Sequence, residues 1–504
     1  MTDSRPRDGW SVHLPPRADA NDLGLLRDES LPGRWTRLWS ERPSWPQLRD
    51  VDDRWLSSDE LESRSRAVAG RFRAAGLAAG DRLAVAGETS ANLVSTYVGA
   101  LRAGLVVVPL NPAYTRAEVA KVLADAAPAA AAVDSAERAS WITKAAEREI
   151  PVWFIDAPLP EGGTDPDAEI DRVGADDPAL LIYTSGTTGK PKGARLTHGN
   201  LLASATAVQL AWRWSPEDRL LLTLPLFHVH GLGVGLIGTL SAGAAVELRP
   251  RFERDDVLER AGAGASMLFG VPTMYQRLAA SDEVDRLRAF RLLVSGSAPL
   301  PPSVAEAIGA AAGQIPLERY GMTETIMLTS NPCDGPRWPG TVGLPFPGVE
   351  VRLGDDDEIQ VRGPNVITEY YQRPDATAEA FTGDGWFRTG DLGELDEHGY
   401  LRIIGRSKEL IITGGFNVYP REVEEQLLSH PDVEEVAVIG RPSQDWGEEV
   451  TAVVVAERPV STEALREHAA DGLAGYKVPK RFEFVDELPR NALGKVLRGE
   501  LSGR

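Results

Sequence analysis

The sequence predicts an α/β fold: a large N-terminal domain of α/β subdomains plus a β-rich subdomain, followed by a small α+β domain at the C-terminus. Between about residues 80 and 300, short and almost wholly apolar runs alternate with helix-length segments. Such runs are typical of strands in parallel sheets that helices cover on both faces. After about residue 350, short alternating runs separated by turn residues predict antiparallel strands.

The elements of the N-terminal part can be assigned in order. Residues 81–87 predict a strand, 90–104 a helix that ends at a glycine, 106–110 a second strand and 116–128 a second helix. The same alternation continues through five more strand-like runs: AAAVD, VWFID, LLTLP, SMLFGVP and RLLVSG. The apolar run 220–246 has no charged residue, but a proline, two histidines and several glycines interrupt it. We therefore expect a buried strand–loop–helix there and no membrane span.

The C-terminal part predicts one more compact unit. Its expected order is helix, strand, strand, helix, strand, on the segments YPREVEEQLLSHP, VEEVAVIGRP, EEVTAVVVAE, STEALREHAADGLA and RFEFVDELP. About 100 residues is a usual size for a domain. We place the boundary within GRSKE, so the predicted domains are 1–405 and 406–504.

Composition narrows the range of partners. The chain has 74 acidic and 54 basic residues and a net charge of −20. Such a surface repels nucleic acid and anionic membranes, so we expect neither as a partner. The single cysteine, Cys333, excludes an internal disulfide and fits a reducing compartment. The N-terminus has no apolar signal segment, which favours a cytoplasmic protein. The sequence leaves the oligomeric state open.

The segment YTSGTTGKPKG, residues 183–193, has the composition of a phosphate-binding loop. It follows a buried strand, and its glycines and hydroxyls can bring N–H and O–H groups to phosphate oxygens. It is not a Walker A loop, because Gly186 and Gly189 are three apart and Pro191 follows Lys190. The alternative is a solvated polar turn, which the position after a buried strand makes the weaker interpretation.

This loop resembles the phosphate loop of the adenylate-forming acyl-CoA synthetases. Six further blocks similar to those of that family follow in order: GSAPL, YGMTE, GWFRTGD, GRSKELI, GGFNVYPREVE and RNALGK. The resemblance implies that a carboxylate reacts with ATP to form an acyl-adenylate and diphosphate, and that the acyl group then passes to CoA. Both steps require charge to be neutralised in a dry site. We therefore expect ATP, Mg²⁺ and CoA to act with a small carboxylic acid.

The resemblance also implies roles for individual residues. Those expected to bind ATP are Thr184, Ser185, Gly186, Thr187, Thr188, Gly189, Lys192, Ser297, Ala298, Tyr320, Thr323, Asp391, Arg406 and Lys495. Within this set, Thr323 would contact the α-phosphate, Tyr320 would line the adenine pocket, and Asp391 and Arg406 would contact the ribose. Glu324 would bind Mg²⁺, because a hard cation prefers oxygen ligands. The catalytic residues implied are Lys495, Thr323, Glu324 and His228.

In the same family the small domain is mobile. The lysine that matches Lys495 neutralises charge during adenylation, when an added cation is worth several kcal/mol in a dry site. Lys408 lies at the position of the family's hinge. Gly414 and Gly415 would let the pantetheine arm of CoA approach the backbone.

Three residues are expected to bind the carboxylic acid and so to determine which acid is used: Arg277, His228 and Met327. Their surroundings, PLFHVHG, FGVPTMYQRL and YGMTETIMLTSNPCDG, resemble the malonyl-CoA synthetase branch. There the matching arginine pairs with the distal carboxylate of malonate or methylmalonate, and a guanidinium suits that role. The alternative is a surface arginine on an amphipathic helix. His228 would be either a gate between the acid and CoA channels or a hydrogen-bonded core histidine.

Other functions stay open at this point. The block TGGFNVYPREVEE is more similar to the branches that activate aryl and fatty acids. A ligase for a monocarboxylic short-chain, fatty or aromatic acid, such as coumarate, is therefore an alternative. A carrier-protein thiol could replace CoA as the acceptor. A non-catalytic AMP-binding module is the least favoured reading, because Lys495 and Glu324 are both present.

Overall fold

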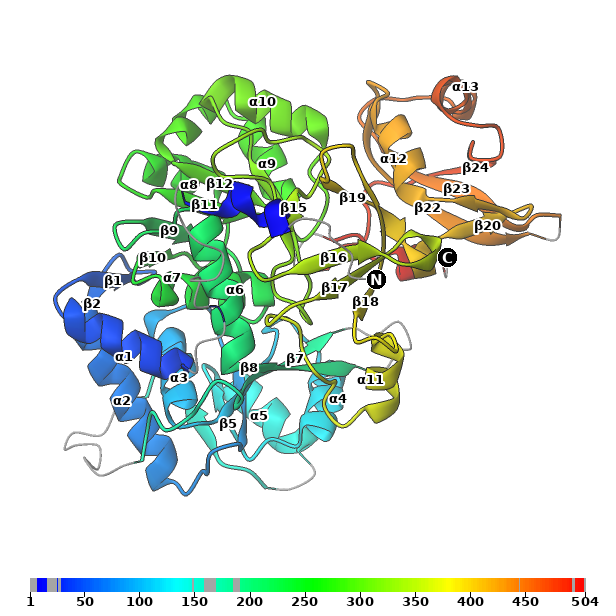
Figure 1. Ribbon diagram of the computed structural model, residues 1–504. Helices are drawn as coiled ribbons and strands as arrows, with labels where there is room; N and C mark the ends of the chain where they lie inside the picture. Colours follow the sequence, from blue (N-terminus) through cyan, green and yellow to red (C-terminus); the bar gives the residue numbers. More distant parts are fainter. Residues whose placement is uncertain are drawn as a thin grey trace. The chain divides into compact units, whose positions relative to one another are not determined.

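The computed structural model describes residues 7–15, 25, 29–146, 149–157, 169–184, 191–443, 445–491 and 495–502. The chain divides into two compact units. The first, here called unit 1, comprises residues 1–350 and 361–387, and unit 2 comprises residues 351–360 and 388–504. The α/β class and the small C-terminal α+β part are as the sequence predicts (Figure 1).

A six-stranded sheet forms one half of unit 1. Its order is β6-β5-β3-β4-β7-β8. Its strands are β3 (Arg82–Ala86), β4 (Val106–Pro109), β5 (Ala130–Val133), β6 (Val152–Phe154), β7 (Pro178–Thr184) and β8 (Lys192–Thr197). All neighbours pair in parallel except β7 and β8, which form an antiparallel hairpin. The strands predicted at 81–87 and 106–110 are thus confirmed.

A nine-stranded sheet forms the other half, in the order β15-β14-β13-β12-β11-β9-β10-β1-β2. Its strands are β1 (Pro46–Arg49), β2 (Trp55–Ser57), β9 (Arg219–Leu222), β10 (Ala245–Leu248), β11 (Met267–Gly270), β12 (Leu292–Ser295), β13 (Leu317–Tyr320), β14 (Thr329–Ser330) and β15 (Leu344–Pro345). The run from β13 to β1 is parallel, and the strands at both ends are antiparallel. Strands β11 and β12 are fully buried and β9 is buried except at Arg219, as their apolar sequences predict.

Helices accompany these sheets, and all of them except α11 contain buried residues. They are α1 (Leu31–Glu41), α2 (Ser58–Ala74), α3 (Ala91–Arg102), α4 (Arg116–Ala126), α5 (Ala136–Ala145), α6 (His198–Ala211), α7 (Gly238–Ser241), α8 (Arg254–Ala261), α9 (Pro272–Ala279), α10 (Pro302–Ala312) and α11 (Pro374–Ala380). The helices predicted at 90–104 and 116–128 are α3 and α4. Several begin at a hydroxyl cap; the side chain of Thr197, for example, accepts from the N–H of Asn200 at the start of α6.

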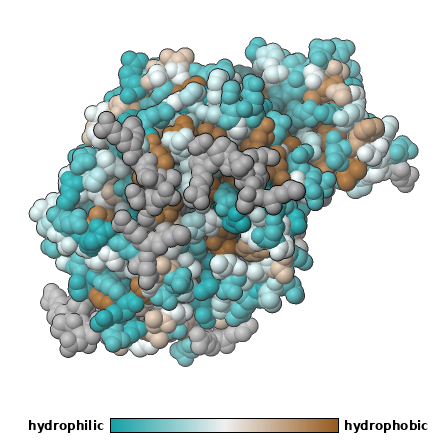
Figure 2. Space-filling model, viewed as in Figure 1, coloured by the Kyte–Doolittle hydropathy of each residue, from teal (hydrophilic) through white to brown (hydrophobic). Residues whose placement is uncertain are grey.

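The apolar run 220–246 is a buried strand, a loop and a helix, as predicted. The helix begins as one π-helical segment, η3 (His230–Ile237), before α7 continues it. A π-helix is often found at functional sites, and periodicity alone did not predict it. Among the described residues, no helix is long and apolar enough to cross a membrane. Hydrophilic side chains occupy much of the face shown in Figure 2.

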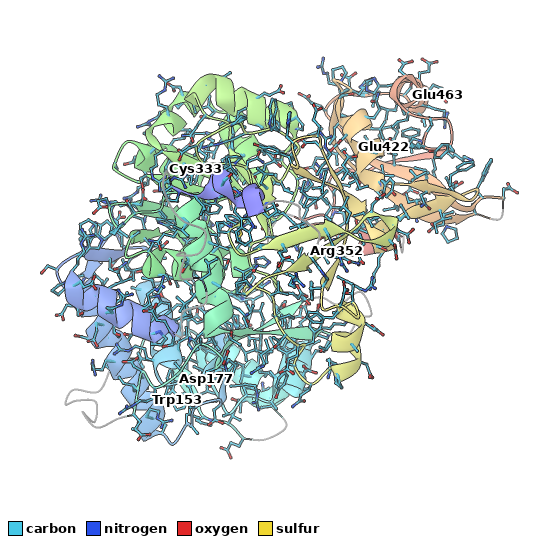
Figure 3. The ribbon with its side chains drawn as sticks, viewed as in Figure 1. Trp153, Asp177, Cys333, Arg352, Glu422 and Glu463 are labelled. Atoms are coloured by element: carbon cyan, nitrogen blue, oxygen red, sulfur yellow. The ribbon has the colours of Figure 1, made fainter. Side chains whose placement is uncertain are left out.

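Unit 2 contains most of a four-stranded sheet and the whole of a five-stranded sheet that is antiparallel except for its last strand. The strands are β16 (Glu350–Leu353), β17 (Glu358–Arg362), β18 (Phe387–Leu395), β19 (Leu401–Arg406), β20 (Ile411–Thr413), β21 (Phe416–Val418), β22 (Val433–Ser443), β23 (Gly447–Ala456) and β24 (Arg481–Phe484). Helices α12 (Pro420–Leu428) and α13 (Thr462–Gly472) alternate with the last strands in the predicted order, and α14 (Arg498–Ser502) follows. Glu422 on α12, labelled in Figure 3, forms an ion pair of 2.5 Å with Lys477.

The two compact units divide at a different place from the predicted boundary. Strands β18 and β19 pair with each other from Asp391–Arg406 to Leu395–Leu401, and the four-stranded sheet β16-β17-β18-β19 falls mainly in unit 2. The division lies near residues 387 and 388 rather than between 405 and 406. The boundary at residues 405 and 406 was predicted as the hinge about which the C-terminal domain rotates. That hinge stays a prediction.

Candidate active site

Several predicted site residues of unit 1 follow the carboxyl ends of neighbouring parallel strands. His228 comes after β9, α9 comes after β11, Ser297 comes after β12, and Thr323 and Glu324 come after β13. Parallel strands present their carboxyl ends at one edge of a sheet, where α/β proteins commonly bind ligands. The fold therefore gathers residues that lie up to about 100 positions apart in the sequence.

The predicted phosphate loop joins the two strands of the β7–β8 hairpin. Thr184 is the last residue of β7 and pairs with Lys192, the first of β8. The hydroxyl of Thr184 donates to the carbonyl oxygen of Lys192 at 3.4 Å. The loop between them lies outside the described residues, and with it the predicted Ser185, Gly186, Thr187, Thr188 and Gly189.

Lys192 and Glu324 both contact Tyr370, which the sequence analysis did not identify. The ammonium of Lys192 lies 5.3 Å from the centroid of the Tyr370 ring. The Tyr370 hydroxyl donates to Oε1 of Glu324 at 2.9 Å. Burial, together with the carboxylate of Glu324, raises the pKa of Tyr370, so the phenol remains a hydrogen-bond donor at neutral pH. These contacts fix the Glu324 side chain, which is only 5% exposed.

Glu324 fits the metal role predicted for it. No cluster of three or more His, Cys, Asp or Glu side chains that could hold a metal occurs among the described residues. A single buried carboxylate suits Mg²⁺, which keeps water and substrate phosphates as its other ligands. One protein carboxylate is therefore what we expect at a site where Mg²⁺ binds together with the phosphates of a nucleotide.

The loop that carries Thr323 and Glu324 is held by close backbone packing. A Cβ atom at Gly321 would lie 2.1 Å from the carbonyl oxygen of Ile326, so only glycine fits there. Nδ2 of Asn365 donates to the carbonyl oxygens of Thr325 and Met327, both at 2.7 Å. This amide thus sets the position of the residues on either side of Ile326. The turn sequence RGPN is the signal that could have pointed to it.

The Asn365 segment is itself anchored to α6. Nδ2 of Asn200 donates to the carbonyl oxygens of Pro364 and Val366, at 2.7 and 3.1 Å. Asn200 also caps the start of its own helix through Thr197. Helix α6 therefore positions the loop that carries Thr323 and Glu324 through Asn200 and then Asn365.

Two histidines and Ser297 form a buried polar group beside this loop. Nδ1 of His230 and Oγ of Ser297 lie 3.1 Å apart, and the N–H of His230 donates to Nδ1 of His228 at 3.2 Å. Ser297 has φ = 72°, in the left-handed region that residues other than glycine rarely adopt. Burial lowers the pKa of His228 to about 4 and lowers the pKa of His230 well below its ordinary value. Both rings are neutral at physiological pH.

Arg319, which the sequence analysis also did not identify, lies next to these histidines. It is the third residue of the buried strand β13, and its positive charge contributes to the lowered pKa values of His228 and His230. Its Nε and Nη2 atoms are buried and have no hydrogen-bond partner among the described residues. Burial lowers the pKa of Arg319 to about 9, which still leaves the guanidinium charged at neutral pH.

The other predicted acid-binding residues are placed differently. Arg277 is exposed on α9, and its guanidinium lies 4.9 Å from the centroid of the Phe252 ring. Met327 is buried, and its carbonyl oxygen accepts from Asn365. The acid-binding roles of Arg277 and Met327 stay predictions, and no hydrogen bond between Arg277 and His228 occurs in the described part of the chain.

Unit 2 brings together three of the residues predicted to act on the nucleotide. Nε of Arg406 lies 2.8 Å from Oδ1 of Asp391, and the two residues are cross-strand neighbours on β18 and β19. Burial is the main cause that lowers the pKa of Lys495, and the positive charge of Arg406 adds to it, while Glu409 and Asp391 oppose the shift. Lys495 is therefore close enough to this pair to feel both charges.

The predicted hinge and CoA-facing residues also lie in unit 2. Lys408 is exposed in the short turn η6 (Ser407–Glu409) that follows β19. Gly414 and Gly415 form the two-residue turn between β20 and β21, with φ of 57° and 83°. The turn requires the left-handed conformation at both positions, which explains the two glycines without reference to a ligand.

Two matches to known protein families establish the class of the protein. Residues 35–371 match the AMP-binding enzyme family, and residues 422–495 match the C-terminal domain of AMP-binding enzymes. The chain belongs to the family of AMP-binding enzymes. The first match includes Glu324 and the second includes Lys495, whose roles in adenylation stay predictions.

Known proteins narrow the class further. A malonate–CoA ligase of Arabidopsis thaliana is 36% identical over 481 residues, covering 86% of this chain and 79% of the relative. A feruloyl-CoA synthase of an Amycolatopsis species is 38% identical over 469 residues, covering 89% and 94%. The crystal structure of ATP-bound MatB from Rhodopseudomonas palustris has a TM-score of 0.88 and 39% identity, covering 94% of this chain and 98% of that one. This AMP-binding enzyme is an AMP-forming acid–CoA ligase, with ATP and CoA as co-substrates.

Proposed function

We propose that the protein joins malonate or methylmalonate to CoA through an acyl-adenylate, with release of AMP and diphosphate. The similarity to a malonate–CoA ligase and to ATP-bound MatB, which extends over most of the chain, carries this proposal. The positive charge of Arg319 beside two neutral histidines supports it, because such surroundings favour an acid with more than one negative group.

In the first half-reaction, a carboxylate oxygen of the acid attacks the α-phosphorus of ATP. The bond between the α-phosphorus and the bridging oxygen breaks, and diphosphate leaves. Lys192 and the loop 185–190 would hold the leaving phosphates, and Thr323 the α-phosphate. Bound at Glu324, Mg²⁺ would neutralise phosphate charge. Lys495 would neutralise the negative charge that develops on the oxygens of the transition state.

We assign roles towards the nucleoside part of ATP to residues of each unit separately. Asp391 is 4% exposed and carries a fixed carboxylate that can accept from the ribose hydroxyls, with Arg406 beside it. Tyr320, Ser297 and Ala298 would line the adenine pocket. A buried tyrosine ring suits a purine because two aromatic faces can stack.

In the second half-reaction, the thiol of CoA attacks the acyl carbonyl and AMP leaves. Gly414 and Gly415 would let the pantetheine arm approach the backbone, and Lys408 would lie at the hinge of the rotation between the two steps. The proposed rotating domain is 406–504. Neutral His228 and His230 could line the route without binding the phosphate charge of CoA.

A second candidate is a ligase for an aromatic acid. The feruloyl-CoA synthase matches more of this chain than the malonate–CoA ligase does, at a similar identity. The CoA-facing block TGGFNVYPREVEE favours the same candidate, because it resembles the aryl-activating branches. Under this reading Arg277 and Arg319 would have structural roles.

Acid-dependent exchange of ³²P-diphosphate into ATP separates the two candidates. The acids are malonate, methylmalonate, acetate, octanoate, coumarate and ferulate, each tested over a range of concentrations. The proposal expects the highest kcat/KM with malonate or methylmalonate. If these two fail while a monocarboxylate is turned over, the proposed substrate is wrong although the ligase class stands.

A further inference from the structure

The carboxylate of Asp125 on α4 binds two side chains from distant parts of unit 1. The hydroxyl of Tyr183 donates to its Oδ2 at 2.7 Å. The guanidinium of Arg373 pairs with its Oδ1. Tyr183 lies 58 positions after Asp125 in the chain and Arg373 lies 248 positions after it, so one side chain joins three separate segments. The Asp125 side chain is only 13% exposed.

The first of these contacts fixes the end of β7. Tyr183 is the next-to-last residue of that strand and precedes Thr184, which is predicted to bind ATP. Strand β4 pairs with β7 at Leu180 and ends at Pro109, before it reaches the level of Tyr183. Burial, together with the hydrogen bond to Asp125, raises the pKa of Tyr183, so its hydroxyl remains a donor at neutral pH. The bond to Asp125 therefore holds β7 at a point that β4 does not reach.

The second contact fixes a segment that borders β8, the last strand of the six-stranded sheet. We call residues 369–373 the edge segment. The N–H of Tyr371 donates to the carbonyl oxygen of Gly193 at 2.8 Å, so the edge segment lies along the outer edge of β8. The ring of Tyr370 contacts Lys192, which is also predicted to bind ATP. The last residue of the edge segment is the arginine that pairs with the α4 carboxylate.

Asp125 thus connects both strands of the phosphate-binding hairpin to one helix. One of its oxygens holds the end of β7, and the other holds the segment that borders the start of β8. Thr184 and Lys192 are paired residues of this hairpin. Figure 1 shows α4 beside the β7–β8 hairpin and beside α11, which follows the edge segment. Loss of the carboxylate would release both strands at the same time.

We propose that Asp125 is a positioning residue that sets the spacing of Thr184 and Lys192 and thereby the affinity for the β- and γ-phosphates of ATP. The inference rests on the proposed function, since it deepens the phosphate-binding role assigned to this hairpin. Hydrogen bonds to a charged group are stronger than neutral ones, and groups that are held in place before binding give higher affinity. A carboxylate repels phosphate, so Asp125 acts through its partners, and Arg373 balances its charge.

The test compares the non-hydrolysable analogue β,γ-imido-ATP with AMP, which lacks the two outer phosphates. Asp125→Ala should weaken binding of the analogue with Mg²⁺ by about tenfold or more, because it removes two hydrogen bonds to a charged group. Binding of AMP should stay within about twofold of wild type, because AMP has no phosphate for this hairpin to hold. Isothermal titration calorimetry measures both affinities without the acid or CoA.

Changes of the two partners divide the effect between the strands. Tyr183→Phe and Arg373→Met each remove one of the bonds, and each should weaken binding of the ATP analogue by about threefold. The variant with both changes should match Asp125→Ala rather than exceed it, because all of them act through one carboxylate. Arg373→Lys keeps the charge and should lose less affinity than Arg373→Met.

Asp134→Ala is the matched control. The Asp134 side chain is 14% exposed, pairs with Arg138 on α5 and accepts from the N–H of Glu88 at 2.7 Å. It resembles Asp125 in burial and in its arginine partner, but its bonds go to α5 and to the residues after β3. Asp134→Ala should lower the melting temperature about as much as Asp125→Ala and leave the ratio of the two nucleotide affinities unchanged. Thioester formation from preformed acyl-adenylate should survive in both variants, because that step needs no outer phosphates.

The outcomes separate this inference from the proposed function. If Asp125→Ala weakens binding of the ATP analogue and of AMP equally, the inference is overturned while the proposed function stands. The inference also fails if Asp134→Ala changes the ratio of affinities as much as Asp125→Ala does. If wild type proves to use another acid and the ratio still changes in Asp125→Ala alone, the proposed substrate is wrong while the role of Asp125 holds. A wild type that binds neither nucleotide overturns both.

Discussion

The hydroxyl of Tyr370 donates a hydrogen bond of 2.9 Å to Glu324, 46 positions earlier in the chain. The same tyrosine ring lies 5.3 Å from the ammonium of Lys192, at the end of the predicted phosphate loop. One aromatic side chain thus links the proposed metal-binding carboxylate to the phosphate-binding strand. This relationship gives the first prediction.

Tyr370→Phe should reduce the kcat/KM of adenylation by about tenfold to 100-fold, because it removes a hydrogen bond to a buried charged group. The Mg²⁺ concentration for half-maximal rate should rise, since Glu324 loses its orienting partner. Diphosphate exchange at several Mg²⁺ concentrations measures both. The control is Tyr371→Phe, which removes only an exposed bond from Gln372. Equal effects in the two variants would contradict the role of Tyr370.

Lys495→Ala should reduce adenylation by several orders of magnitude, because a positive charge is lost where negative charge develops. Formation of the thioester from preformed acyl-adenylate should survive, since that step does not use this charge. Single-turnover assays of each half-reaction test the difference. Lys477→Ala, which removes the ion pair with Glu422 and a cation–π contact with Tyr476, is the control and should spare both steps. Equal loss of both half-reactions in Lys495→Ala would show that the assigned role is wrong.

Gly321→Ala should abolish adenylation, because its Cβ atom would lie 2.1 Å from the carbonyl oxygen of Ile326 and would displace the loop with Thr323. Gly313→Ala provides a contrast, since it has a positive φ of 78° but no atom within 4 Å of the added Cβ. That change should cost only about 1 kcal/mol of stability. Thermal melting and diphosphate exchange separate the two effects. Normal exchange by Gly321→Ala would mean that the loop can shift freely.

Buried histidines should make the protein less stable in acid. Burial lowers the pKa of His13, His198 and His228 to about 4 from an unfolded value near 6.5. Between these two values the unfolded chain binds more protons than the folded one, so stability is complete above pH 6.5 and falls towards pH 4. Each histidine contributes a slope of up to about 1.4 kcal/mol per pH unit in this window.

Urea unfolding between pH 7.5 and pH 4.5 tests this behaviour. His198 is the residue to change, because it is buried outside the proposed chemistry and neither ring nitrogen has a partner in the described part of the chain. His198→Gln should flatten the pH dependence by up to about one proton. An unchanged slope would show that His198 is protonated, or solvated, in the folded protein.

The regular parts of the fold could be predicted from the sequence. The strand now seen as β3 and the helix α4 are set by local apolar patterns, and their predicted positions differ from the structure by one or two residues. The π-helix at His230 could not be predicted, because its backbone hydrogen-bond pattern leaves no distinct signal in the apolar periodicity of the segment. The compact units divide near residue 387, where β18 begins, whereas the predicted boundary at 405 and 406 concerns a hinge and stays a prediction.

The residues of the candidate site, like the elements of the fold, could be predicted from the sequence only in part. Glu324, Lys192 and Asp391 lie in recognisable motifs, so their proximity to other predicted residues could be expected. Tyr370, Asn365 and Arg319 lie outside or at the edge of those motifs, and their roles depend on contacts between segments far apart in the chain. In sequence, Arg319 is only a charged residue within a strand. Its importance becomes visible when burial and the absence of a counter-ion among the described residues are known.

A competition assay tests the central claim most directly. The enzyme is given ATP, Mg²⁺, CoA and an equimolar mixture of malonate, methylmalonate, acetate, octanoate and ferulate, and the thioesters are quantified by mass spectrometry at low conversion. The amounts then report the ratios of kcat/KM among the acids. We predict that malonyl-CoA or methylmalonyl-CoA is the main product. A mixture dominated by feruloyl-CoA, octanoyl-CoA or acetyl-CoA would contradict the account.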